Sequence, residues 1–222
     1  MSKPTEDQVT CPNCGTTSDT QIWESLNSIL NHDEVEQLLE GTLFMHECPE
    51  CHSTIELTYP CLYNDMQAHA MVQYIVDEKD TDEAIQTIEK LQKDDDAAEE
   101  TALVRTRIVT SHNALREKVL LFRDGLDDMA VEALKAVIMN RFIDEGQIQN
   151  GADADVFYSG LTEAGDLVLA FIVDGKSAQT MAPKALYARI LAMVEDSAYA
   201  KKGAYLVDSV WAELFFKNQA GM

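Results

Sequence analysis

Two short stretches, Cys11-Pro12-Asn13-Cys14 and Cys48-Pro49-Glu50-Cys51, decide how the N-terminal part of this chain folds. Each stretch is a CPxC motif, and 33 residues separate the two. Two pairs of thiolates are a typical ligand set of a tetrahedral zinc site, which four cysteines close against water and substrate. The motifs therefore predict a structural Zn²⁺ site with Cys11, Cys14, Cys48 and Cys51 as its ligands.

The residues around the cysteines predict tight turns. A proline after the first cysteine restricts one backbone dihedral, and a glycine after the second permits the left-handed conformation that turns the chain back. Gly15 has this place in the first motif, but His52 has it in the second. We therefore expect either a strained second turn or an altered coordination, in which His52 or His46 replaces a cysteine.

The pattern around the motifs predicts a zinc-ribbon-like domain over residues 8–78. The separation of the motifs exceeds the roughly 15–20 residues usual for such ribbons, and an inserted helix accounts for the difference. This helix has Asn31 or Asp33 as its N-cap and Gly41 as its terminator. Extended segments flank the motifs. We expect strands at 20–23, 43–47, 54–59 and 69–76, so that each motif lies at a strand-to-strand turn.

The second half of the chain is predicted to form a separate α+β domain. A helix over 81–93 and the acidic Asp94–Asp96 form a predicted linker at 79–100, and the C-terminal domain covers 101–222. Its predicted elements are a strand at 102–109, helices at 111–122 and 127–142, a hairpin of 155–160 with 166–173, a helix from Pro183 and an apolar docking segment at 205–216. The predicted fold class is therefore α+β throughout.

Charge is distributed unevenly along the chain. The net charge is −22, and residues 1–100 hold 23 Asp and Glu against 4 Lys, which leaves −19 in that half. Nucleic-acid binding requires Lys and Arg to displace counterions from phosphates. We therefore expect no nucleic-acid partner and no anionic membrane partner, and we expect solubility or an acidic face for a basic partner instead.

Location follows from composition and cysteine use. No apolar run approaches the roughly 20 residues of a membrane-spanning helix, and the N-terminus MSKPTEDQVT has no apolar core of a secretory signal. Thiolate–metal sites suit a reducing compartment, so we expect a cytoplasmic protein. The fifth cysteine, Cys61, lies in the apolar stretch TYPCLY. It is best interpreted as a buried, inert thiol, with a regulatory or fifth-ligand role as the alternative.

Signals for catalysis are weak. CPxC is also the active-site turn of thiol oxidoreductases, but there it opens a long helix after a core strand. The motifs GxSxG, HExxH, GxxxxGK[ST] and GxGxxG are absent from the sequence. His112 lies in a polar cluster with Arg116, for which helix capping and surface ion pairs are the simplest explanation. We therefore predict no catalytic and no organic-cofactor residue.

Several stretches resemble the CpXC family, a group of bacterial and archaeal proteins without a characterised function. The resemblance rests on VTCPNCG (9–15), ESLNSIL (24–30), LLEGTLF (38–44), CPECH (48–52), TYPCLYNDM (58–66) and RIVTSHNALREKVLLFRDGLDDMAVEALK (107–135). It implies a metal-ligand role for the four motif cysteines, and no activity or substrate.

The sequence thus predicts a non-catalytic zinc-binding protein that acts as an interaction or regulatory module. Its acidic surface would bind a protein partner, or the chain would form a homo-oligomer. A thiol redox protein, or another enzyme with an unrecognised pocket, is the alternative.

Overall fold

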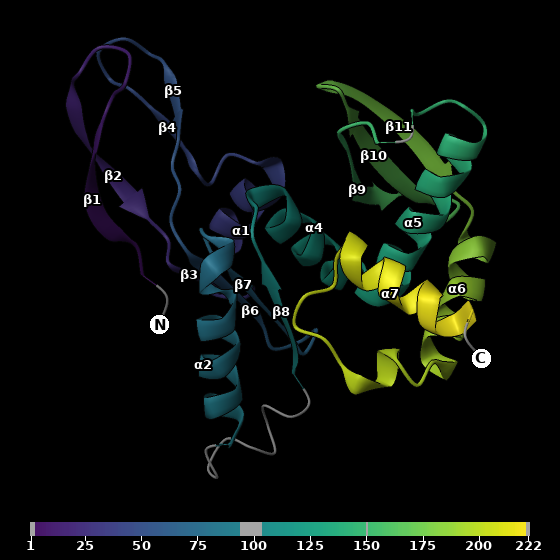
Figure 1. Ribbon diagram of the computed structural model, residues 1–222. Coiled ribbons are helices and arrows are strands. Elements are labelled where there is room, and N and C mark those ends of the chain that lie inside the picture. Colours follow the sequence, from purple (N-terminus) through teal and green to yellow (C-terminus); the bar gives the residue numbers. More distant parts are fainter. Residues whose placement is uncertain (1–2, 94–103, 150, 221–222) are drawn as a thin grey trace. The chain divides into compact units, whose positions relative to one another are not determined.

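The computed structural model describes residues 3–93, 104–149 and 151–220, and it divides the chain into two compact units (Figure 1). The units are Met1–Arg116 and Glu117–Met222. Both contain helices and strands, which confirms the predicted α+β class. The acidic triplet Asp94–Asp96 lies outside the described residues. Within the described ranges, no helix has both the length and the apolar composition needed to cross a bilayer.

Two antiparallel hairpins carry the CPxC motifs in the N-terminal unit. Strand β1 (Thr5–Thr10) pairs with β2 (Thr17–Ile22), and the first motif lies in the turn between them. Strand β4 (Met45–Glu47) pairs with β5 (Thr54–Glu56) around the second motif. Most side chains of these strands are exposed or only half-buried. The hairpins therefore bury little apolar surface of their own, and their tips need another source of stability.

The predicted inserted helix is α1 (His32–Glu40), and it lies between the two hairpins in sequence. It buries Val35, Leu38 and Leu39 on one face. Gly41 ends the helix at φ +80°, where its backbone N–H donates to carbonyls of the last turn. A residue with a Cβ rarely adopts this dihedral, so glycine determines where the chain leaves the helix.

A four-stranded sheet forms the core of the N-terminal unit. Its strands are β3 (Ser25–Asn27), β6 (Cys61–Asp65), β7 (Ala70–Tyr74) and β8 (Arg105–Val109), in the order β3-β6-β7-β8. Strands β6 and β7 are antiparallel, whereas β3 pairs with β6, and β8 with β7, in parallel. No sequence signal predicts β3 or β6, because β3 is only three residues long and β6 follows Pro60 directly.

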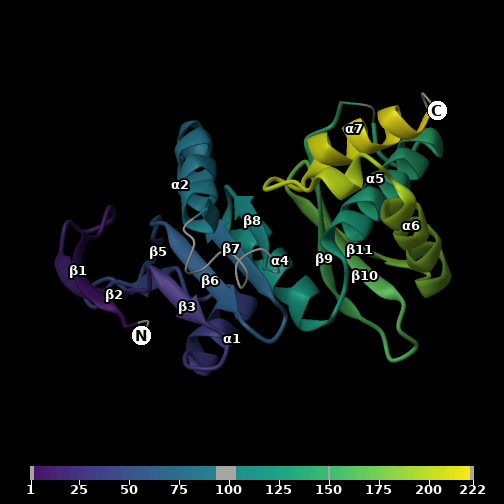
Figure 2. The same cartoon turned by 90° about the horizontal axis from the view of Figure 1, so that it is seen from below.

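Helix α2 (Thr81–Lys93) follows the short 3₁₀ turn η1 (Glu78–Asp80) and runs along the sheet (Figure 2). Its Ala84, Thr87 and Ile88 line a pocket together with Leu62 and Met71 of the sheet. The alternate side chains of β6 and β7 are fully buried. The sheet is therefore the packing platform of this unit.

Strand β8 belongs to the sheet of the N-terminal unit, which extends to Arg116. It pairs with β7 from Ala70↔Arg105 to Tyr74↔Val109. A parallel pairing needs a crossover connection and leaves no local signal in the sequence, so the strand cannot be assigned to its sheet from composition alone.

His112 has a packing role besides its predicted polar one. It begins α4 (His112–Arg123), but its ring stacks on Phe44, with centroids 3.9 Å apart and planes within 10°. Tyr74 meets the same ring edge-on at 4.8 Å. The Nδ1 atom lies 2.8 Å from Glu56 Oε1. His112 therefore combines a ring cluster, which the sequence did not predict, with a contact to one partly exposed carboxylate.

The C-terminal unit contains an antiparallel three-stranded sheet. Its order is β11-β10-β9, with β9 (Ala154–Leu161), β10 (Leu167–Val173) and β11 (Lys176–Ala182) joined as consecutive hairpins. The β9–β10 hairpin was predicted, whereas β11 was not, because KSAQTMA has little apolar character. Alternate residues of β10 are buried, so one face of the sheet forms the core.

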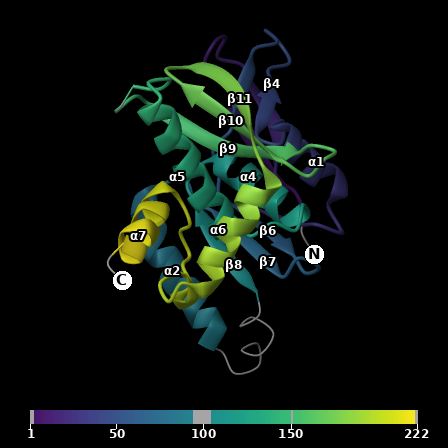
Figure 3. The ribbon, with the colours of Figure 1, turned by 90° about the vertical axis from the view of Figure 1, so that its right-hand side faces the viewer.

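Helices α5 (Asp128–Asp144), α6 (Lys184–Asp196) and α7 (Ser209–Ala220) pack with this sheet (Figure 3). Asp127 caps α5 by accepting from the backbone N–H of Ala130 at 2.9 Å. The predicted apolar segment 205–216 contains most of α7. Its rings enter the core, where the indole of Trp211 stacks on Phe215 with centroids 5.4 Å apart.

Charged side chains are buried beside this apolar core. Lys135 Nζ lies 3.1 Å from both Glu117 carboxylate oxygens and 2.8 Å from Glu132 Oε2. Lys118 donates to Asp128 Oδ2 at 3.1 Å. Glu117 Oε1 also accepts from a backbone N–H of β9 at 2.6 Å. Each buried charge thus has an opposite charge in direct contact, as burial in a low dielectric requires.

Candidate metal centre

The two cysteine turns have the same backbone geometry. The N–H of Cys11 donates to the Thr16 carbonyl at 2.8 Å, and the N–H of Gly15 donates to the Cys11 carbonyl at 2.9 Å. The second turn repeats both bonds, from Cys48 to the Ser53 carbonyl and from His52 to the Cys48 carbonyl, each at 3.0 Å. Each turn therefore holds its two cysteines at one end of a hairpin.

The turns bring four sulfur atoms together. All four Sγ atoms of Cys11, Cys14, Cys48 and Cys51 lie within 4.8 Å of one another. The pairs Cys11–Cys51 and Cys14–Cys48 are each 3.6 Å apart. Ligands about 2.3 Å from a tetrahedral zinc ion are about 3.8 Å from each other. The set therefore fits a tetrahedral ion of zinc's size, and the predicted grouping of these four residues is what the structure contains.

Burial of the sulfur cluster is uneven. Cys11 and Cys48 are buried, Cys51 is half-buried and Cys14 is exposed. None of the five cysteines forms a disulfide. Burial and the neighbouring Cys14 and Cys51 thiols outweigh the backbone N–H groups that favour the thiolate, and they raise the pKa of Cys48 to about 11. Because a bound cation would favour the thiolate instead, metal binding at this cluster must release protons.

Two polar side chains contact the sulfurs. Ser53 Oγ lies 2.9 Å from Cys51 Sγ and 3.4 Å from Cys11 Sγ, and Asn13 Nδ2 donates to Cys51 Sγ at 3.5 Å. The Ser53 and Asn13 contacts lower the pKa of Cys51 to about 5, and Ser53 with the Cys14 backbone N–H lowers the pKa of Cys11. Our sequence reasoning missed both residues, although each lies inside or directly beside a motif.

The family of the chain follows from these residues. The sequence pattern of the CpXC protein family matches residues 9–135, which include both cysteine turns and most of the N-terminal unit. The chain belongs to the CpXC family. No curated protein and no solved structure matches this CpXC chain.

The other predicted ligand candidates have different contacts in this CpXC protein. His46 Nε2 lies 2.9 Å from Ser18 Oγ, and His52 Nδ1 lies 2.7 Å from Glu47 Oε1. Among the described residues, the group able to hold a metal contains only the four motif cysteines. Cys61 is fully buried in β6, and burial raises the pKa of its thiol to about 12. The structure thus groups the four motif cysteines and places Cys61 outside the group as a buried thiol.

Proposed function

We propose that this CpXC protein is a zinc-binding, non-catalytic interaction module whose acidic N-terminal unit binds a basic protein partner. The observation that carries the proposal is the convergence of four sulfurs from two hairpins that bury little apolar surface. Soft thiolates in a tetrahedral arrangement select zinc over oxygen-seeking cations. Such an ion would have no open position for a substrate, so its role would be structural. It would stabilise the fold by joining the two hairpins.

The charge of the N-terminal half supports a basic partner. The β1–β2 hairpin exposes Glu6, Asp7 and Asp19. Complementary charge accelerates association and selects partners of opposite sign. The same charge repels nucleic acid and anionic lipid. A cytoplasmic basic protein is therefore the partner we propose, with a second copy of this chain as the other candidate.

Metal content tests the zinc part of the proposal. Elemental analysis of the purified protein is expected to find about one zinc per chain, as four thiolate ligands require. Cys48→Ser removes a buried ligand and is expected to lose the metal and unfold the hairpins. Cys61→Ala is the matched control, because it removes a buried thiol outside the cluster and should retain zinc. Unchanged melting after chelation would contradict the proposal.

Thiol redox chemistry is the competing hypothesis, and the two make opposite predictions. A redox CPxC motif opens a helix, whereas both motifs here lie in hairpin turns. This position supports the metal-site hypothesis. If the cysteines were catalytic, they would react with a disulfide reagent without a chelator and turn over with glutathione. If they hold zinc, the reagent reacts quickly only after chelation, and no turnover occurs.

Salt dependence tests the partner. We expect a basic protein to be retained by the immobilised full chain at low ionic strength and released as salt screens the charges. Light scattering of the protein alone, at low and high salt, reports whether a second copy is the partner. Absence of any salt-dependent partner would refute the acidic-surface part of the proposal and leave the zinc part intact.

A further inference from the structure

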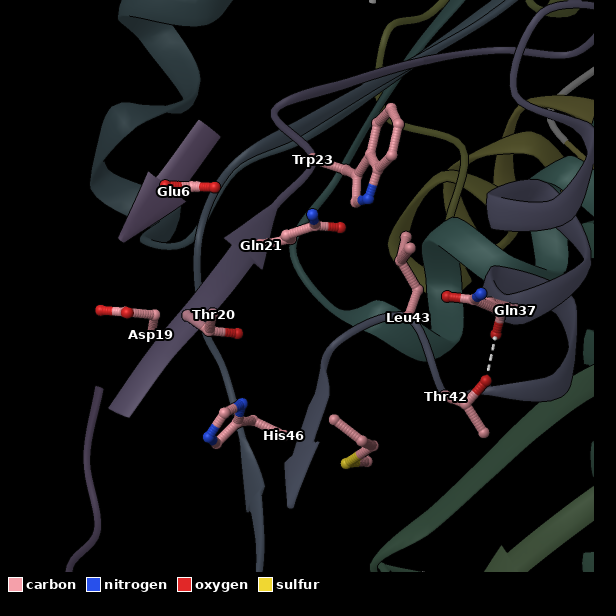
Figure 4. Close-up of a pocket in the computed structure, with 10 residues that line it drawn as sticks. Glu6, Asp19, Thr20, Gln21, Trp23, Gln37, Thr42, Leu43 and His46 are labelled. Carbon is pink, nitrogen blue, oxygen red and sulfur yellow. Dashed lines mark hydrogen bonds between the residues drawn. The ribbon is translucent and has the colours of Figure 1, made fainter. Parts of the chain in front are cut away.

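A polar pocket lies between the two hairpins of the N-terminal unit (Figure 4). Its volume is about 450 Å³. One wall comes from β1, β2 and the residue that follows β2, and the other comes from α1, the segment after it and β4. The residues that matter for its chemistry are Glu6, Asp19, Gln21, Trp23, Leu43 and His46.

The lining combines negative charge with an aromatic and apolar wall. Glu6 and Asp19 contribute two carboxylates, and none of the lining residues is Lys or Arg. Within the described chain, neither carboxylate forms an ion pair with a cation, and Asp19 accepts only from Gln8 Nε2 at 3.0 Å. Figure 4 shows Gln21 pointing toward Leu43, with Trp23 beside them, while Asp19 lies at the opposite edge of β2. The pocket thus has an anionic rim and a neutral inner wall.

This division fits a long cationic side chain. The carbon stem of Lys or Arg packs on apolar surface while its charged head stays at a polar rim. An indole ring attracts a nearby cation through its π face, and carboxylates form charge-assisted hydrogen bonds with guanidinium or ammonium groups. An anionic ligand would meet two carboxylates without a compensating cation in the lining.

We infer that this pocket binds a lysine or arginine side chain of the basic partner, so the inference rests on the proposed function and specifies its contact site. The two walls belong to hairpins that are joined at the four-cysteine cluster and by the Ser18–His46 contact of 2.9 Å. The pocket therefore needs both hairpins in place. Loss of the metal should weaken ligand binding even though no ligand touches the cysteines.

A fluorescent hexa-arginine peptide tests the inference on the full chain, with a hexa-citrulline peptide as the uncharged probe of the same shape. Anisotropy at physiological salt should detect the arginine peptide only. The double variant Glu6→Gln/Asp19→Asn should weaken binding about tenfold, because charge-assisted bonds are about twice as strong as neutral ones. Trp23→Leu should weaken binding about threefold without changing the charge.

The matched control is Glu78→Gln/Asp82→Asn, which removes two exposed carboxylates of the same unit outside the pocket. Charges beyond the screening length of about 8 Å contribute little, so this variant should bind within twofold of the wild type. If both double variants lost the same affinity for the arginine peptide, the assignment of binding to the pocket would be wrong. The acidic surface as a whole would then bind the basic partner, as the proposed function states, without a specific site. Undiminished binding by Trp23→Leu together with Glu6→Gln/Asp19→Asn would also overturn it.

Free spermidine, used as a competitor, distinguishes a peptide side chain from a free polyamine as the source of the cationic group. If spermidine displaces the fluorescent peptide less effectively than unlabelled arginine peptide does, the ligand is a peptide side chain. Stronger competition by spermidine would overturn that assignment. Failure of the proposed function itself has a different signature, because then the immobilised chain would retain no basic protein at any salt concentration.

Discussion

Gly15 and His52 occupy equivalent positions in the two cysteine turns, and both have left-handed backbone, at φ +78° and +57°. Each donates its N–H to the carbonyl of the first cysteine of its motif. This conformation is easy for glycine and unfavourable for histidine. The second turn thus has the strain that its sequence predicts, while the group of residues able to hold a metal consists of the four cysteines.

Substitutions at these two positions should differ in their effect on the free energy of unfolding. Gly15→Ala is expected to lower the free energy of unfolding by about 1 kcal/mol, because alanine must adopt a left-handed dihedral; a Cβ at Gly15 would meet no atom within 4 Å, so no clash contributes. His52→Gly relieves that strain but loses an exposed ion pair with Glu47, and should not lower stability. Urea unfolding of the zinc-saturated protein measures both. A destabilised His52→Gly would contradict this account.

Metal removal should act on one unit. The C-terminal unit has an apolar cluster of its own, including Leu169, Phe171 and Phe215, whereas the hairpins of the N-terminal unit expose most of their side chains. Chelation is therefore expected to lower the melting temperature of the N-terminal unit alone. Calorimetry would report one transition that moves and one that does not. A common shift of the whole profile would show that the metal stabilises both units.

The buried lysine of α5 should be costly to remove. Lys135→Met leaves Glu117 and Glu132 as unpaired buried carboxylates, which typically costs about 3–5 kcal/mol. Burial raises the pKa of Glu132 despite the nearby lysine. The unpaired carboxylates should therefore bind protons, and the variant should recover stability as pH falls. The double variant Lys135→Met/Glu132→Leu should lose less than Lys135→Met alone. Equal losses would mean that the cluster stabilises only through packing.

Cys61 should make stability sensitive to alkaline pH. Its pKa is about 12 in the folded chain, against an ordinary value of 9.0, because the thiol is buried. The folded state therefore holds this proton more tightly, and the contribution is present below pH 9 and lost as pH rises toward 12. Cys61→Ala should flatten the decline of the urea midpoint over that range. A parallel decline in both proteins would assign it to other groups.

Native-state alkylation checks the same thiol independently. Because its thiolate is scarce and its side chain fully buried, Cys61 should react with iodoacetamide only after unfolding. Mass spectrometry of the zinc-loaded protein is expected to find Cys61 unmodified. Rapid modification would contradict the inert interpretation of this residue.

Local features of the chain could be predicted from the sequence because their causes lie within a few residues. The CPxC turns, the glycine at the end of α1 and the start of α5 next to Asp127 all depend on backbone conformations and hydrogen bonds between near neighbours. The same holds for the β9–β10 hairpin, whose alternating pattern is visible in the sequence. The α+β class and the grouping of four cysteines follow from these features.

Tertiary structure alone decided what depends on distant residues. The parallel pairing of β8 with β7 joined residues 105–109 to the sheet of the N-terminal unit, and the ring stack of Phe44 on His112 added a packing role to a residue predicted to lie in a polar cluster. The pocket beside Trp23 likewise exists only where two hairpins meet. A sequence records which side chains are available, but pairing and burial are set by contacts between segments far apart in the chain. For this CpXC protein, the cysteines determine how the hairpins are joined, and the tertiary structure decides which surface lies between them.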